Sequence, residues 1–148
     1  MAREIKAPGG LTIRKTVNNV VVIDKKPSFG AFNADMTGAK GPVPGAITVQ
    51  ATGTNVDFSQ LTEPGWVELF NMDDAETVQY GIWDRVLTTF FPLGELEPGQ
   101  GVSFKLSRDF GERHDEGVGT GTTDTSEVKL RMYSESADVA VYVGAYER

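Results

Sequence analysis

The residues best suited to acid–base chemistry gather in one polar stretch, residues 108–126. It contains His114, the only histidine of the chain, close to the carboxylates of Glu112, Asp115 and Glu116. A histidine beside a carboxylate can act as a general base, but it needs a nucleophile to activate. The chain has no cysteine and no serine in a G-x-S-x-G turn, and a zinc site would need a further nitrogen or sulfur ligand. We therefore expect His114 to lie in a surface loop, without a catalytic or zinc-binding role.

The same stretch holds two patterns that are typical of ion or phosphate binding. Its acidic residues could bind calcium, but their spacing does not match the calcium-loop pattern D-x-[DN]-x-[DN]-G. Residues 117–121 read G-V-G-T-G, yet a phosphate-binding loop leads into a helix, and here Thr-Thr-Asp-Thr-Ser and a strand pattern follow. We expect a solvated loop here, with no metal and no cofactor.

Two functions that use other residues stay open. Pairs of aspartate and glutamate could hydrolyse glycosides, because their separation is set by the fold and is invisible in the sequence. Aromatic residues could instead form a platform for a sugar, although aromatic residues on strands more often pack against their neighbours. The candidates for such a platform are Trp66, Trp83, Tyr133, Tyr142 and Tyr146. A carbohydrate- or receptor-binding module is therefore one alternative, and a hydrolase is another.

The composition argues against nucleic acid and membrane partners. Acidic residues outnumber basic ones by 21 to 14, so the net charge of −7 repels phosphate backbones. The first ten residues, MAREIKAPGG, contain no apolar stretch of signal-peptide length, and no run of about 18 apolar residues occurs anywhere. We expect a soluble protein that is made in the cytoplasm and is stabilised by packing or assembly, since it has no cysteine for disulfides.

Alternation of apolar and polar residues predicts strands along most of the chain, because successive side chains of a strand point to opposite faces. The clearest case places Ala137, Val139, Val141, Val143 and Ala145 on one face. The other expected strands are 11–16 and 20–24, which a tight turn at 18–19 joins, and then 47–51, 66–71, 77–83, 86–91, 102–106 and 128–132. Polar turns are expected at residues 72–76 and near residue 84.

This spacing of about eight or nine short strands predicts an all-β fold, an antiparallel β-sandwich of jelly-roll type. The 17 glycines and 7 prolines fit a chain with many turns, and a length of 148 residues fits a single domain, residues 1–148. Two segments, residues 24–46 and 108–126, lack the strand pattern. Unstructured segments of this length in compact domains are either disordered or functional.

Three segments in the second half of the chain resemble small virion proteins of tailed bacteriophages. They read PGWVELFNMDDAETVQYGIWD from residue 64, FFPLGELEPGQGVSFKLS from residue 90 and VAVYVGAYER from residue 139. The resemblance covers residues 46–148 and consists of strands and turns without a reactive residue. It implies a structural part of the virus particle, in the first place a capsid decoration (cement) protein, otherwise a head-to-tail or tail component. It also implies a protein that is not an enzyme.

A decoration protein needs an interface, and residues 24–46 are the segment that we expect to supply it as an extended arm. Prolines limit the entropy that the arm loses on binding, and apolar side chains can anchor it while lysines steer it toward an acidic shell. The expected anchors are Phe29, Phe32, Met36 and Val43, and the expected lysines are Lys25, Lys26 and Lys40. The expected partners are the major capsid protein, other virion proteins and further copies of the chain in a closed homo-oligomer, for which a trimer is the simplest form.

Overall fold

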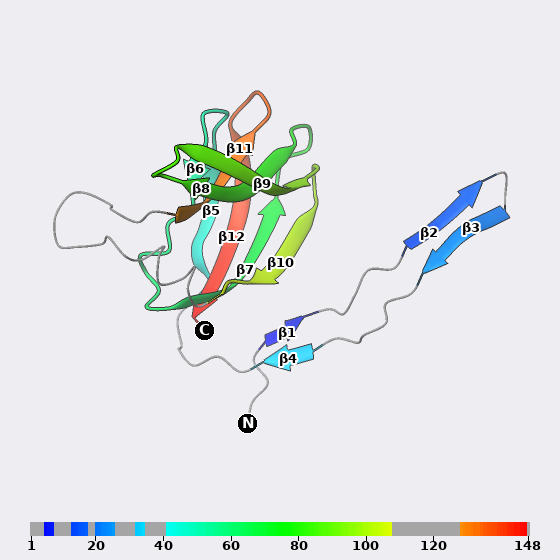
Figure 1. The fold of residues 1–148 in the computed structure, drawn as a ribbon, viewed down its shortest axis with the longest axis horizontal. Coiled ribbons are helices and arrows are strands. Elements are labelled where there is room, and N and C mark those ends of the chain that lie inside the picture. The colour runs from blue at the N-terminus through cyan, green and yellow to red at the C-terminus, as the bar shows by residue number, and fades with distance from the viewer. Residues whose placement is uncertain are drawn as a thin grey trace. The chain divides into compact units, whose positions relative to one another are not determined.

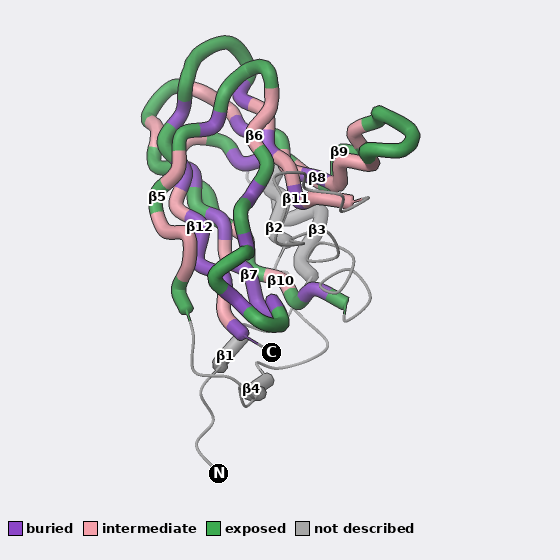
Figure 2. The backbone as a smooth tube through the Cα atoms, turned by 90° about the vertical axis from the view of Figure 1, so that its left-hand side faces the viewer, coloured by how far each residue is buried: buried purple, intermediate pink, exposed green. Residues whose placement is uncertain are grey.

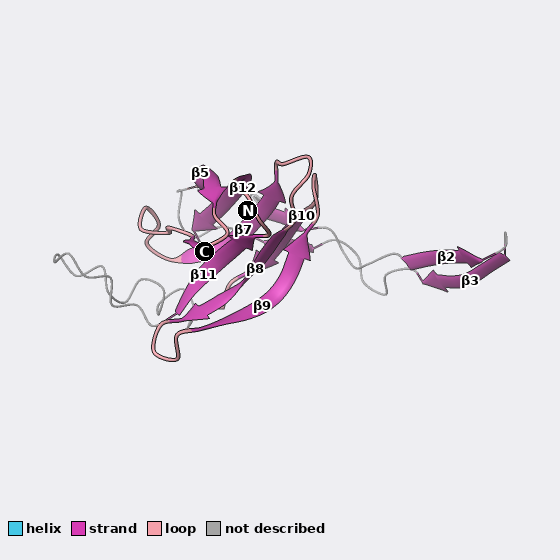
Figure 3. Cartoon of the chain, turned by 90° about the horizontal axis from the view of Figure 1, so that it is seen from above, coloured by secondary structure: helices cyan, strands magenta, loops and turns pink. Residues whose placement is uncertain are grey.

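The computed structural model describes residues 5–7, 13–17, 20–25, 32–34, 41–107 and 128–147 of the chain. The chain divides into two compact units, residues 1–36 and residues 37–148. All regular elements of the described residues are strands (Figures 1 and 3). Within the described part, no helix has the length and hydropathy needed to cross a bilayer.

The first unit contains two antiparallel strand pairs. Strand β2 (Ile13–Val17) pairs with β3 (Val20–Lys25), and Val17 lies opposite Val20. This pairing confirms the hairpin predicted around residues 18–19. Strand β1 (Ile5–Ala7) pairs with β4 (Phe32–Ala34), a pairing that the sequence pattern did not indicate.

The second unit is a β-sandwich of two antiparallel sheets with four strands each, as the sequence predicted. Sheet I has the strand order β10-β7-β12-β5, and sheet II has the order β6-β11-β8-β9. The strands are β5 (Val43–Val49), β6 (Thr54–Asn55), β7 (Pro64–Asn71), β8 (Val78–Asp84), β9 (Thr89–Leu96), β10 (Gly101–Lys105), β11 (Val128–Ser134) and β12 (Val139–Glu147). Some neighbouring strands come from distant parts of the chain. Strand β5, for example, pairs with β12 at the C-terminal end.

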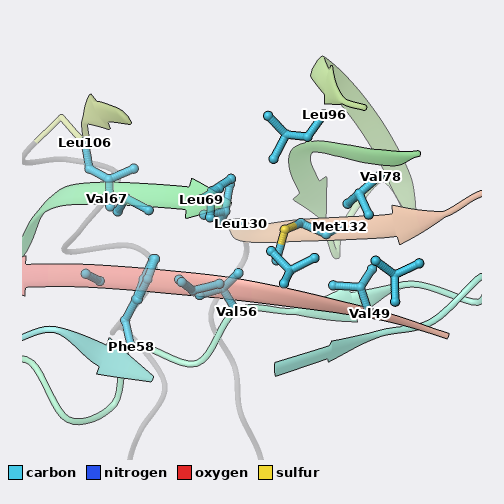
Figure 4. Packing of buried hydrophobic residues seen from close by; sticks show 14 of the residues in the cluster. Val49, Val56, Phe58, Val67, Leu69, Val78, Leu96, Leu106, Leu130 and Met132 are labelled. Carbon is cyan, nitrogen blue, oxygen red and sulfur yellow. The ribbon is translucent and has the colours of Figure 1, made fainter. Parts of the chain in front are cut away.

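The core lies between the two sheets and follows the predicted alternation. Four alternate residues of β12, Val139, Val141, Val143 and Ala145, have no exposed surface. The remaining core side chains come from both sheets, and Figure 4 shows several of them from close by. They include Val49, Val67, Leu69, Val78, Leu96, Leu130 and Met132. Because each strand places one face in this core, its other face is turned away from the core.

The connection between β6 and β7 also packs into the core, although it forms no strand. Val56, Phe58 and Leu61 are buried there, and Phe58 has no exposed surface. The Val56 amide donates to the Leu130 carbonyl over 2.9 Å, which fastens the connection to β11. The Leu61 amide donates to the Phe58 carbonyl over the same distance, 2.9 Å. These bonds satisfy backbone groups that would otherwise be buried without a partner.

The structure corrects several strand boundaries. The strand expected at 86–91 begins only at Thr89, because residues 85–88 form a turn in which the Leu87 amide donates to Asp84 Oδ1 over 2.8 Å. Ala51 and Ala137 are exposed and lie outside strands β5 and β12. Residues 24–46 include β4 and the beginning of β5, where the sequence pattern predicted no strand. The turn expected at 72–76 is confirmed.

Candidate functional site

The acid–base candidates of the sequence lie outside the described residues. This holds for His114 and for its acidic neighbours in the segment 108–126, so the predictions on this segment stay predictions. Among the residues that the structure describes, no group of three or more His, Cys, Asp or Glu residues could hold a metal ion.

The acidic turn between β7 and β8 serves the local structure. Asp73 Oδ1 accepts hydrogen bonds from the amides of Glu76 (2.9 Å) and Ala75 (2.8 Å), and these bonds lower the pKa of the carboxyl. Ser136 donates to the Glu76 carboxylate over 3.0 Å, which ties the turn to the β11–β12 connection. The turn is therefore a hydrogen-bonded corner of the sandwich.

The five predicted platform aromatics do not form one platform. Trp66, Tyr142 and Tyr146 belong to sheet I, and Trp83 and Tyr133 belong to sheet II. In both sheets they occupy strand positions that alternate with core residues, so they lie on the two opposite outer faces of the sandwich. Trp66 is only 8% exposed, which leaves little of its ring for a ligand.

On the outer face of sheet I, Tyr146 and Glu68 form a hydrogen-bonded pair across β12 and β7. The Tyr146 hydroxyl donates to Glu68 Oε1 over 3.1 Å. Gly144 makes room for the carboxylate, since a Cβ at this position would lie 2.5 Å from Glu68 Oε1. Burial and the bond to Glu68 raise the pKa of Tyr146 to about 12. The pair holds two strands together at the surface of the sheet.

The raised pKa of Tyr146 predicts a late step in an alkaline titration. Because a tyrosine ionises at about pH 10 in an unfolded chain, the stabilisation from the neutral Tyr146 is complete below that pH and is lost as the pH rises toward about 12. Tyrosinate absorbance should therefore contain a component near pH 12 that the Tyr146→Phe variant lacks. Identical titration curves for the two proteins would contradict the assignment.

Four large apolar side chains stand exposed on the β8–β9 hairpin. Val86 (66% exposed) and Leu87 (62%) lie in the turn, and Phe91 (46%) and Leu93 (64%) lie on β9. We call them the apolar ridge. Figure 2 shows the turn as an exposed loop beside the labels β8 and β9, and most residues of β9 are exposed. Strand β9 is an edge of sheet II, and Pro92 removes one amide hydrogen from it. Because the proline interrupts the row of backbone donors, a partner would contact the exposed side chains of the hairpin instead of adding a strand to its edge.

The outer face of sheet II carries a cluster of aromatic rings around one arginine. The Arg131 guanidinium carbon lies 4.4 Å from the centre of the Trp83 ring and 5.1 Å from the centre of the Tyr133 ring. Phe90 contacts Tyr133 with their ring centres 4.7 Å apart. Arg131 Nη2 also donates to the carbonyl of Thr52 over 3.1 Å, which holds the guanidinium between the rings.

A hollow of about 400 Å³ lies next to this cluster, at the start of β8 and the ends of β9 and β11. Tyr133 belongs both to the cluster and to the wall of the hollow. The other lining residues are polar or acidic: Thr77, Gln79, Glu95, Glu97, Ser134 and Glu135. The sequence did not predict this site, because its members come from three strands whose pairing is not visible in the sequence.

The predicted partner-binding residues are only partly described. Val43 begins β5, is half-buried and packs against the core. Lys25 ends β3 and Phe32 begins β4, and only their backbone is described. The others, Lys26, Phe29, Met36 and Lys40, lie outside the described residues. Their role in binding stays a prediction.

Comparison of the chain with models of known families, with characterised proteins and with solved structures finds no match in any of the three. The resemblance to bacteriophage virion proteins therefore rests on the strand and turn segments of the sequence alone.

Proposed function

We propose that this protein is a virion structural protein, a capsid decoration protein of a tailed bacteriophage that binds the head surface by protein–protein contacts. The observation that carries the proposal is the apolar ridge. Its four side chains are 46–66% exposed, although the sandwich beside them has a well-filled core. Val86 and Leu87 are neighbours in the chain, and large apolar side chains that stay exposed next to each other mark interaction sites in soluble proteins. The function is then adhesion, with no covalent step.

The position of the ridge suits a rigid contact. A turn closed by the bond from the Leu87 amide to Asp84 Oδ1 presents Leu87, and β9 is held along its length by β8. A backbone that is already fixed in this way loses little conformational entropy on binding. A stable interface needs about 1,000 Å² or more, so the ridge would act as the apolar centre of a larger contact. Residues 24–46, with the predicted anchors, would make a contact of their own with the shell.

The proposed partners follow from this mode of binding. The major capsid protein is the surface that the ridge would contact, and further copies of the chain would complete a closed homo-oligomer, in the simplest case a trimer. The net charge of −7 fits a protein that acts on a protein shell and avoids the packaged nucleic acid. The protein would be made in the host cytoplasm and would end in the virion.

Loss of two ridge side chains should weaken capsid binding. The test mixes the purified protein with capsids of the same virus assembled without it, and measures the protein that sediments with them. The double variant Leu87→Ser/Leu93→Ser should bind roughly tenfold or more weakly, because apolar anchors carry most of the energy of an interface. Both residues are more than 60% exposed, so the fold should be unaffected.

A second double variant removes the same kind of surface elsewhere. Phe70 (43% exposed) and Met72 (52%) lie at the end of β7 and in the following turn, outside the ridge. Phe70→Ser/Met72→Ser should bind capsids like the unchanged protein. Failure of the unchanged protein to sediment with capsids, together with its absence from purified particles, would end the proposal. Recovery with tails in place of heads would assign it to the tail.

A further inference from the structure

The hollow on sheet II brings six side chains into two rows. Gln79 of β8 lies opposite Glu95 of β9 and Tyr133 of β11, so these three side chains lie side by side on the outer face. Thr77 lies two residues before Gln79, and Glu97 and Glu135 lie two residues after Glu95 and Tyr133; because the strands are antiparallel, these three line the same hollow in a second row. Its volume of about 400 Å³ lies within the range of about 300–1,000 Å³ that small-molecule sites occupy.

Several polar groups in this hollow have no protein partner. Within the described part of the chain, the side chains of Gln79, Glu95 and Glu135 form no hydrogen bond and no ion pair, and all three are exposed. Carboxylates accept hydrogen bonds only, whereas the amide of Gln79 both donates and accepts. The hollow is therefore an array of acceptors that suits a ligand with many hydroxyl donors.

The aromatic wall of the hollow is held in place before any ligand binds. Tyr133 packs between Phe90 and the Arg131 guanidinium, and Arg131 is bonded to the Thr52 carbonyl. Gly53 has a φ of +94°, and a Cβ there would lie 2.4 Å from Arg131 Nε, so a glycine lets this loop approach the arginine. Tyr133 stays partly exposed between these neighbours, so it offers the hollow an ordered aromatic edge at low entropic cost.

The surrounding charges narrow the class of ligand. Three carboxylates repel phosphates and acidic polysaccharides. A metal ion does not fit, since no group of described acidic residues could hold one. A basic peptide could pair with the carboxylates, but Arg131 already holds the place over Trp83 where an aromatic ring would add a cation–π contact, so hexalysine serves as the competing probe below. A neutral sugar combines hydroxyl donors for the carboxylates with an apolar C–H face for an aromatic ring.

We infer that the hollow bounded by Gln79, Glu95, Glu135 and Tyr133 binds a neutral oligosaccharide. Sugar hydroxyls donate to the two glutamates and exchange hydrogen bonds with the Gln79 amide, and one sugar ring lies against the Tyr133 side of the hollow. Binding is reversible and leaves the sugar unchanged. This site does not depend on the proposed capsid contact, because Val86 and Leu87 of the ridge lie in the turn at the other end of the same hairpin.

Calorimetric titration with three neutral probes tests the inference: maltohexaose, cellohexaose and chitohexaose. At least one should bind the protein. Glu95→Gln and Gln79→Ala should each weaken that binding about tenfold, since the first exchanges a charged acceptor oxygen for a donor and the second removes the amide. Glu63→Gln and Gln60→Ala are the matched controls, because both residues are exposed in the β6–β7 connection away from the hollow. They should leave the affinity unchanged.

Three results would overturn the inference. The first is that none of the three sugars binds at millimolar concentration. The second is that Glu95→Gln and Gln79→Ala bind sugar like the unchanged protein. The third is that hexalysine binds in the hollow and the sugars do not. The last result would assign the hollow to a basic peptide. The turn variant Val86→Ser/Leu87→Ser should weaken capsid binding and bind the sugar normally, and Glu95→Gln should bind capsids normally, so failure of one proposal is distinguishable from failure of the other.

Discussion

Replacing Phe58 by alanine is expected to lower the free energy of unfolding by about 3–5 kcal/mol. Phe58 is among the largest fully buried side chains of the sandwich and belongs to its single described core cluster. Truncation removes the apolar surface that the ring buries and leaves a cavity that the two hydrogen-bonded sheets cannot close. Urea unfolding followed by tryptophan fluorescence measures the change, since both tryptophans lie in sandwich strands.

The same substitution at Phe70 is the control. Phe70 is 43% exposed on β7, so Phe70→Ala should cost about 1 kcal/mol or less. Similar losses for the two variants would show that the β6–β7 connection does not pack into the core as described.

Replacing Asn71 by leucine is expected to lower the free energy of unfolding by about 2–4 kcal/mol, although leucine fills a similar volume. Asn71 has no exposed surface, and its Nδ2 donates to the carbonyls of Glu76 (2.8 Å) and Leu96 (3.0 Å). Its Oδ1 accepts from the Asp73 amide over 3.0 Å. Leucine would leave these groups without partners at the corner where β7, the following turn and β9 meet, and an unsatisfied buried group costs about 1–3 kcal/mol.

Asn55→Leu provides the matched control for this prediction. Asn55 is exposed at the end of the short strand β6, so its replacement should change stability by about 0.5 kcal/mol or less. Thermal and urea unfolding of the two variants would give the comparison. An Asn71→Leu protein as stable as the unchanged one would mean that the amide does not hold this corner.

The two proposed binding sites share one hairpin, and the turn residues Val86 and Leu87 of the ridge lie at the end away from the hollow. The apolar ridge begins at the turn between β8 and β9, and the hollow lies where β8 starts and β9 ends. This separation allows variants at one end to leave the other intact, because well-separated residues without shared partners act independently. A decoration protein with both sites would bind the head with one end and present a sugar-binding surface with the other.

Local patterns identified most strands of the sandwich correctly. The alternation in β12 predicted its buried face at Val139, Val141, Val143 and Ala145, and the same rule located β7, β8, β10 and β11. The predicted strand boundaries were wrong where a turn contains apolar residues. Val86 and Leu87 continue the alternation, but the Asp84 side chain bonds the Leu87 amide and turns the chain, so β9 starts later.

The candidate sites were less visible in the sequence. The sequence indicates Trp83 and Tyr133 as possible sugar contacts, but it does not separate them from Trp66, Tyr142 and Tyr146, which lie on the other sheet. Gln79, Glu95 and Glu135 carry no motif, and only the pairing of β8 with both β9 and β11 brings them together. A register of strands is set by the whole sandwich, so residues that share a row cannot be read from spacing along the chain.

By itself the sequence determined the all-β class, the antiparallel sandwich and the buried face of its central strand, because these follow from period-two alternation and turn residues within short stretches. Only the tertiary structure decided which strands are neighbours, that Phe58 fills the core from a connection without regular structure, and that the hairpin turn exposes Val86 and Leu87. These features depend on contacts between residues far apart in the chain, and such contacts form only when the two sheets pack against each other.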